Sequence, residues 1–224
     1  MKVKDAMTTS VITISPDASL KEAAALFAEH AVGGLPVLDG SGSVMGVVTE
    51  VDILLKESGE SPQGGLRGLL HRDETQALES KVNAHTVEEA MSSPAITVEA
   101  ERSVALAAGL MLDHGVNRLP VVERGELVGI ITRHDLVRAF ARSDSELERD
   151  IREEAFSGIS WTEDLQLTVK NGEVVLRGEI DSKYDAEAVP DRIRAIPGVV
   201  SVDSELSAWD LEGKKKVLVS IHRD

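Results

Sequence analysis

Hydrophobic and polar residues alternate along the first two thirds of the chain in a pattern that occurs twice, with an offset of 84 residues. Each copy begins with a short β-rich segment, at 11–14 and 95–98, followed by apolar residues at helical spacing. Ser19 opens the first of these helices, and Glu22 completes a capping box. Ser103 opens the second. The pattern predicts two similarly folded repeats.

Two strands and a second helix follow in each copy. In the first copy, apolar runs at 35–38 and 44–49 flank the turn 39–43, whose glycines favour positive φ. This turn joins two strands and lacks the G-x-G-x-x-G spacing, so we do not interpret it as a phosphate loop. The second helix is expected at 49–56, and its counterpart at 132–140. Each copy therefore has the order β-α-β-β-α.

The sharpest repeated motif has the form Gly-x-x-Thr-x-x-Asp and follows a Leu-Pro-Val strand. Its two copies are Gly46, Thr49 and Asp52, and Gly129, Thr132 and Asp135. The offset between the copies falls from 84 to 83 in the preceding turn, which a single deletion explains. A threonine three residues before an acidic residue favours a helix start, with the threonine as N-cap and the acid near the positive end of the helix dipole.

These features resemble the cystathionine-β-synthase-type (CBS) repeat, and the tandem resembles the pair called a Bateman module. The resemblance covers residues 3–56 and 87–140. It implies an α+β fold, in which two β-α-β-β-α repeats pack as a pseudo-two-fold pair. It further implies a regulatory, energy-sensing protein that binds AMP, ADP or ATP and forms a homodimer through the pair.

The helix starts and the resemblance together define candidate nucleotide-binding residues. A strand that ends at a helix N-terminus exposes backbone N–H groups that favour phosphate. The threonine hydroxyls can reach the ribose or the first phosphate. The resemblance implies that the aspartates bind the ribose hydroxyls and that aliphatic side chains lie near the base. The candidates are Thr49, Asp52, Thr132, Asp135, Arg118, Arg133, Ile12, Ile96, Val116 and Pro120.

The two motifs differ in charge. Arg118 and Arg133 stand beside the second motif, whereas Glu50 lies within the first. A phosphate would be repelled by the carboxylate and would form charge-assisted hydrogen bonds with the arginines. We therefore expect the phosphorylated ligand to prefer the site of Asp135, leaving the first site empty or holding a less charged, adenosine-like ligand. The alternative for Arg133 is a solvated arginine on a helix surface.

The remaining sequence predicts a linker and a third domain. The boundaries are repeats at 1–56 and 87–142, a helix-containing linker at 57–86, and a C-terminal domain at 143–224. The linker begins with a segment rich in Gly and Ser. It fits either a mobile arm or a dimer contact.

The C-terminal domain is expected to form a charged helix, a hairpin, a second helix and further strands. Asn171-Gly172 is typical of a hairpin turn, and Pro190 is expected to kink or interrupt the helix at 184–196. With Gly178 and Gly198, the pattern resembles the BON domain, a small α/β fold. That resemblance implies phospholipid binding or attachment. The acidic character of this region instead favours a protein partner or signal output, and we expect no membrane binding.

Composition excludes several functions. The 224 residues contain no cysteine, which removes disulfides and thiolate metal sites. The formal net charge of −15 disfavours nucleic acid and anionic lipid, so a phosphorylated ligand needs a local cationic pocket. No apolar stretch follows the basic N-terminal residues, which argues against a signal peptide and favours the cytoplasm.

The sequence also lacks the motifs of the common enzyme classes. The six histidines form no His-x-x-x-His or His-Glu-x-x-His pattern, and there is neither a Gly-x-Ser-x-Gly motif nor a P-loop. We expect no catalytic residue, no metal and no required cofactor. Two alternatives to a nucleotide-binding module stay open. One is a scaffold protein that binds no ligand, and the other is a lipid- or envelope-associated module acting through the BON-like domain.

Overall fold

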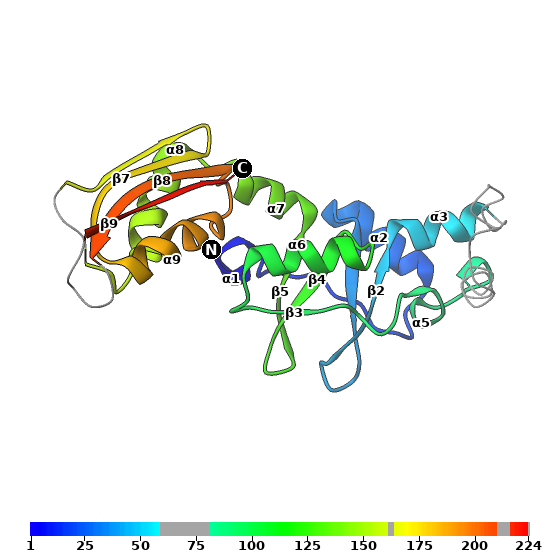
Figure 1. The fold of residues 1–224 in the computed structure, drawn as a ribbon. Helices are drawn as coiled ribbons and strands as arrows, with labels where there is room; N and C mark the ends of the chain where they lie inside the picture. Colours follow the sequence, from blue (N-terminus) through cyan, green and yellow to red (C-terminus); the bar gives the residue numbers. More distant parts are fainter. Residues whose placement is uncertain (59–80, 161–163, 210–215, 224) are drawn as a thin grey trace, which may run out of the picture. The chain divides into compact units, whose positions relative to one another are not determined.

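The computed structural model divides the chain into two compact units, an N-terminal unit of residues 2–133 and a C-terminal unit of residues 134–224 with Met1 (Figure 1). The structure describes residues 1–58, 81–160, 164–209 and 216–223. Most of the helix predicted within the linker lies outside the described residues.

The N-terminal unit contains the first predicted repeat and all of the second except its last helix. The first repeat comprises α1 (Val3–Ala6), α2 (Leu20–His30), β1 (Gly34–Leu38), β2 (Val44–Thr49) and α3 (Glu50–Ser58). The second comprises α5 (Val87–Ala90), β3 (Val98–Glu99), α6 (Val104–Asp113), β4 (Arg118–Glu123) and β5 (Glu126–Thr132), and α7 (Arg133–Phe140) follows it. The predicted order of helices and strands is confirmed with two differences. Each repeat begins with a short helix that was not predicted, and the strand expected at 11–14 is reduced to one parallel bridge between Ile14 and Val37.

Local signals fix the beginnings of the first helices as the sequence predicts. The Ser19 hydroxyl accepts a hydrogen bond from the backbone N–H of Glu22, whose carboxylate accepts from the N–H of Ser19. The Ser103 hydroxyl accepts from the N–H of Leu106. These caps satisfy N–H groups that have no partner within the helix, so the helices begin at residues set by sequence alone.

The two repeats exchange their leading segments. Thr8 forms a reciprocal pair of backbone hydrogen bonds with Ile130, each of 2.9 Å, and Ser92 forms the equivalent pair with Val47, of 2.9 and 3.0 Å. Thr8 and Ser92 are related by the 84-residue offset, and Val47 and Ile130 by the 83-residue offset. The segment that precedes each repeat therefore pairs with the last strand of the other, in the expected pseudo-two-fold arrangement.

A glycine stands at each of these crossing points. A Cβ atom added to Gly46 would lie 2.6 Å from the Met91 sulfur and 2.8 Å from the Ser92 carbonyl oxygen. At Gly129 the equivalent neighbours are Met7 and Thr8. The glycines of the two Gly-x-x-Thr-x-x-Asp motifs are thus required by close approach of the partner repeat, which the sequence did not indicate.

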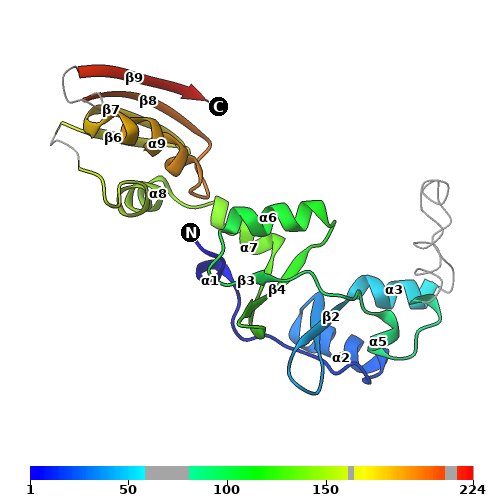
Figure 2. The same ribbon diagram turned by 60° about the horizontal axis from the view of Figure 1, so that its bottom comes forward.

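The C-terminal unit is a four-stranded sheet covered by helices (Figure 2). Its elements are α8 (Asp144–Asp150), the π-helix η1 (Ile151–Ala155), β6 (Gln166–Lys170), β7 (Glu173–Ser182), α9 (Lys183–Arg194), β8 (Ser201–Trp209) and β9 (Lys216–Arg223). The strand order is β6-β7-β8-β9, with β7 and β8 parallel and the other pairs antiparallel. Apolar residues of α8, η1 and α9 form the core with the inner face of the sheet.

Two predictions for this unit concern the turn at Asn171-Gly172 and the helix that contains Pro190. Asn171 and Gly172 both have positive φ, of 52° and 76°, which confirms the hairpin turn. Of the two expected effects of Pro190, an interruption of the helix is contradicted, because α9 continues through it. The Pro190 ring is buried, and such burial can offset the loss of one helical N–H group.

Asp144 holds the hairpin turn to α8. Its two carboxylate oxygens accept hydrogen bonds from the backbone N–H groups of Asn171, at 2.8 Å, and Gly172, at 2.9 Å. We expect Asp144→Ala to lower the free energy of unfolding by about 1–2 kcal/mol, because both N–H groups lose their acceptor. Urea denaturation checks this, with Asp181→Ala as the matched exposed control. An unchanged midpoint for Asp144→Ala would contradict the assignment.

Candidate functional site

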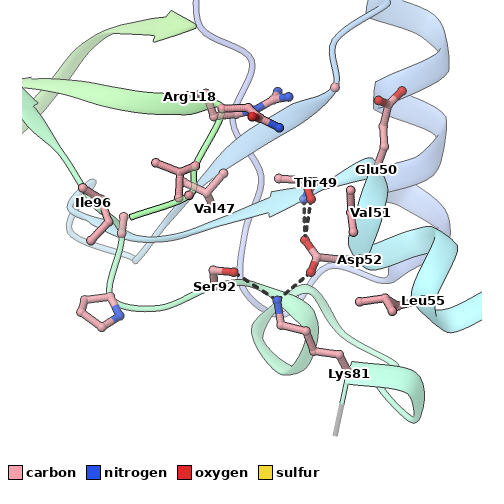
Figure 3. A pocket seen from close by; sticks show the side chains of 16 residues that line it. Val47, Thr49, Glu50, Val51, Asp52, Leu55, Lys81, Ser92, Ile96 and Arg118 are labelled. Carbon is pink, nitrogen blue, oxygen red and sulfur yellow. Dashed lines mark hydrogen bonds and ion pairs between the residues drawn. The ribbon is translucent and has the colours of Figure 1, made fainter. Parts of the chain in front are cut away.

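A cavity of about 450 Å³ lies in the N-terminal unit at the start of α3 (Figure 3). Its size is typical of a small-molecule site. Residues from both repeats and from the segment between them line it: Gly33, Val47, Thr49, Glu50, Val51, Asp52, Leu55, Lys81, Ser92, Pro94, Ala95, Ile96, Gly115, Val116, Asn117 and Arg118. Five of the ten sequence-predicted site residues are among them, namely Thr49, Asp52, Ile96, Val116 and Arg118.

Asp52 is the most buried polar group of this cavity. Its side chain stands in the first turn of α3 and the residue is 4% exposed. Oδ2 accepts hydrogen bonds from the Thr49 backbone N–H, at 2.8 Å, and from the Thr49 hydroxyl, at 2.9 Å. Oδ1 accepts from Lys81 Nζ at 2.6 Å. The helix start predicted from the motif is therefore confirmed, and it aims the carboxylate at a cavity instead of at bulk water.

Aliphatic side chains form the walls of the cavity. Val47 comes from β2 and Leu55 from α3 of the first repeat, while Ile96 and Val116 come from the second (Figure 3). Among the residues that the structure describes, no aromatic side chain lines it. Such walls can cover both faces of a flat heterocycle by apolar contact alone, while the polar groups at the helix start fix its orientation.

At one end of the cavity, the Arg118 guanidinium and the Glu50 carboxylate both lie beside Gly33. The Arg118 guanidinium lies so close to Gly33 and Gly34 that a Cβ on either glycine would clash with it, and Glu50 Oε2 also approaches Gly33. Burial lowers the pKa of the Arg118 guanidinium, and the neighbouring Glu50 carboxylate partly offsets this. The arginine stays charged at neutral pH, because its pKa begins far above that range.

The backbone and the side chain of Arg118 contribute to different motifs. Arg118 is expected beside the second motif, and its backbone pairs there with Thr132 across β4 and β5. Its side chain lines the cavity of Thr49 and Asp52. The repeats exchange segments, so a motif of one repeat faces walls supplied by the other. Of the two arginines that favour phosphate at the second motif, Arg118 therefore also supplies a positive charge to the cavity at the first motif.

The other five predicted residues do not line this cavity. Thr132 ends β5, and Asp135 is buried in the first turn of α7, 3.8 Å from Arg138. Arg133 is exposed. Ile12 packs against the apolar core of the first repeat, and Pro120 is buried in β4. Thr132 and Asp135 fall on opposite sides of the division between the two units, so a site at the second motif stays a prediction.

Sequence reasoning missed Lys81 and Ser92. Lys81 Nζ lies 2.6 Å from Asp52 Oδ1 and 3.1 Å from Ser92 Oγ. Neither residue belongs to a repeated motif, and Lys81 precedes the second repeat. Ser92 enters the site because its backbone pairs with Val47. Only the exchange of segments brings these groups to the first motif.

The fold and the cavity define a tandem-repeat module with a small-molecule pocket shared between its repeats. The family model of the CBS domain matches residues 3–59 and 87–142, and that of the BON domain matches residues 143–217. The chain therefore belongs to the CBS-domain family and carries a C-terminal BON domain.

Curated relatives are similar to about three fifths of the chain. The CBS domain-containing protein YhcV of Bacillus subtilis is 34% identical over 134 residues, which are 60% of this chain and 81% of YhcV. The protein MJ1404 of Methanocaldococcus jannaschii is 34% identical over 143 residues, which are 62% of this chain and 32% of MJ1404. The chain thus spans most of the length of YhcV but only about a third of the length of MJ1404.

Two solved structures are similar in fold. The structure of CBSX2 in complex with AMP has a TM-score of 0.53 at 33% identity, covering 62% of this chain and 94% of that one. The CBS domain pair of MJ0100 in complex with 5-methylthioadenosine and S-adenosyl-L-methionine has a TM-score of 0.50 at 28% identity, covering 63% and 100%. Both proteins bind adenosine derivatives.

Across the part of the chain that the structure describes, no helix combines the length and apolar character needed to cross a bilayer. Within the same residues, no group of three or more His, Cys, Asp or Glu side chains is arranged to hold a metal ion.

Proposed function

We propose that this protein is a non-catalytic regulatory module that binds an adenine nucleotide of the AMP, ADP or ATP type in the cavity at Asp52. The observation that carries the proposal is a buried carboxylate at a helix start, aimed into a cavity with aliphatic walls. A carboxylate in that position can accept hydrogen bonds from two ribose hydroxyls. The complexes of CBSX2 and MJ0100 support an adenosine-type ligand for this kind of pair.

The charges of the cavity favour a definite orientation of the ligand. The ribose lies at Asp52, the base between Ile96 and Val116, and the phosphate toward Arg118. This proposal reverses the preference expected from the sequence, because Arg118 accompanies the first motif. The second motif, with Thr132 and Asp135, is kept as a second proposed site of lower phosphate affinity.

We expect Arg118→Ala to weaken AMP binding about 10-fold or more while leaving adenosine binding within about twofold of wild type, because only AMP carries the phosphate that the guanidinium would pair with. Isothermal titration calorimetry with both ligands checks this. Arg102→Ala, at an exposed arginine outside the cavity, is the matched control. Equal weakening of both ligands would mean that Arg118 shapes the cavity without contacting phosphate.

Ligand binding would be transmitted through the shared construction of the cavity. Since both repeats supply its walls, a bound nucleotide favours one relative placement of the repeats. That change in placement would report that the ligand is bound. We further propose a cytoplasmic homodimer, formed through exposed apolar residues of α3 such as Val51 and Leu54, which are 59% and 65% exposed. The BON domain would bind the protein that receives the signal.

One experiment separates the proposed function from its alternatives. Mass spectrometry of the small molecules released by denaturing the purified protein is expected to yield an adenine nucleotide in proportion to the protein. A scaffold that binds no ligand would release none, and would show no calorimetric heat with AMP, ADP or ATP. A lipid-associated module would instead co-sediment with vesicles of anionic phospholipid through the BON domain.

A further inference from the structure

Lys81 forms an ion pair with the carboxylate that is proposed above to bind the ribose. Its ammonium lies 2.6 Å from Asp52 Oδ1 and 3.1 Å from Ser92 Oγ, inside the cavity. The side chains of the ion pair are 18% and 5% exposed, for Lys81 and Asp52 respectively. This is a largely desolvated pair, unlike the surface ion pair of Lys4 and Glu101, whose side chains are 45% and 55% exposed.

Counting acceptors on Asp52 shows that Lys81 and a ribose compete. A carboxylate has about four lone-pair positions, two on each oxygen. Thr49 donates two hydrogen bonds to Oδ2, and Lys81 donates one to Oδ1. One position is left, whereas a ribose diol brings two hydroxyl donors. Full recognition of the ribose therefore requires the ammonium to leave Oδ1.

The displaced ammonium needs another anion. A buried charge that loses its partner is strongly unfavourable, so a ligand that removes Lys81 from Asp52 must supply a substitute. A nucleotide phosphate supplies one, and an uncharged nucleoside does not. The long, flexible stem of lysine allows its ammonium to move within a cavity of this size.

We propose that Lys81 determines the specificity of the cavity by coupling ribose binding to the presence of a phosphate. In this mechanism Lys81 blocks Asp52 against adenosine, and with AMP it turns from Asp52 to the phosphate, which then lies between Lys81 and Arg118. The mechanism rests on the proposed function, and it explains how a cavity that also contains Glu50 can accept an anionic ligand.

The test compares AMP and adenosine by isothermal titration calorimetry on wild type, Lys81→Gln and Lys81→Arg. For Lys81→Gln we expect tighter adenosine binding and weaker AMP binding, so that the ratio of the two dissociation constants falls about 10-fold or more. Lys81→Arg is expected to keep most of the ratio, since it keeps the charge. Lys4→Gln, which breaks the surface pair with Glu101, is the matched control and is expected to behave as wild type.

The outcomes are distinguishable. If Lys81→Gln changes both affinities by the same factor, Lys81 serves only to hold its segment in place and the mechanism is overturned. Lys81→Met, which keeps the length of the stem, repeats the comparison if Lys81→Gln unfolds at a lower temperature than wild type. If wild type binds neither AMP nor adenosine, the proposed function fails together with the mechanism. If wild type binds AMP and the ratio is unaffected in both variants, the mechanism alone fails.

Discussion

Replacing Asp52 with asparagine is expected to weaken AMP binding at least about 100-fold. The carboxylate would accept two charge-assisted hydrogen bonds from the ribose, each contributing about 1.5–3 kcal/mol. Asparagine keeps a single acceptor oxygen, already required by Thr49, and turns an NH₂ donor toward the ligand. The amide also faces the Lys81 ammonium, a second donor, where wild type has an ion pair of 2.6 Å. Calorimetry with AMP measures the effect.

The control variants separate binding from folding. Asp52→Asn leaves the Lys81 charge buried without its partner, which by itself destabilises a protein by about 3–5 kcal/mol. The double variant Asp52→Asn with Lys81→Met removes both charges and is expected to fold and to bind AMP much more weakly than Lys81→Met alone. Asp39→Asn, in the exposed turn between β1 and β2, is the matched control. A folded double variant with wild-type affinity for AMP would contradict the role of Asp52.

The same titration on Asp135→Asn compares the two motifs. If the cavity at Asp52 binds the phosphorylated ligand, Asp135→Asn is expected to bind AMP more tightly than Asp52→Asn does. The opposite result would restore the preference that the sequence suggested, in which the second motif binds the phosphorylated ligand and the first does not.

Gly46→Val is expected to lower the free energy of unfolding of the N-terminal unit by about 3 kcal/mol. Valine is favourable in a β-strand, so local propensity alone predicts a gain. The loss arises because a Cβ at this position would lie 2.6 Å from the Met91 sulfur and 2.8 Å from the Ser92 carbonyl oxygen. The backbone carbonyl cannot move without breaking its pairing with Val47, so the strain is not relieved by a rotamer change.

Chemical denaturation followed by circular dichroism tests this expectation. Gly40→Val, in the turn where a Cβ meets no atom within 4 Å, is the matched control and is expected to stay within about 0.5 kcal/mol of wild type. Combining Gly46→Val with Met91→Ala is expected to recover part of the loss, since it removes one of the two clashing groups. If Gly46→Val and Gly40→Val have the same free energy of unfolding, the exchanged segments do not pack as the structure shows.

The sequence was sufficient for features that depend on neighbouring residues. The caps at Ser19 and Ser103, the helix start at Thr49 and the Asn171-Gly172 turn each follow from groups within a few positions of one another. The correspondence between equivalent residues of the two repeats follows from comparing the sequence with itself. Helix α9 differs only because burial of the Pro190 ring in tertiary packing outweighs its local effect.

The composition of the pocket could not be predicted in the same way. It depends on the backbone pairing of Val47 with Ser92, two residues that lie 45 positions apart in the sequence. Grouping residues by repeat does not predict that the Arg118 side chain lines the cavity of the first motif, because the exchange of leading segments brings this motif to walls of the other repeat. Lys81 stands outside both repeats, and no spacing or periodicity marks it as a partner of Asp52.

The central claim is that the cavity at Asp52 binds an adenine nucleotide, and a crystal structure of the protein grown with AMP tests it most directly. We expect the ribose hydroxyls within hydrogen-bonding distance of the Asp52 carboxylate, the base between Ile96 and Val116, and the phosphate beside Arg118. AMP bound elsewhere, with the cavity at Asp52 unfilled at a concentration that saturates the protein in solution, would contradict the claim.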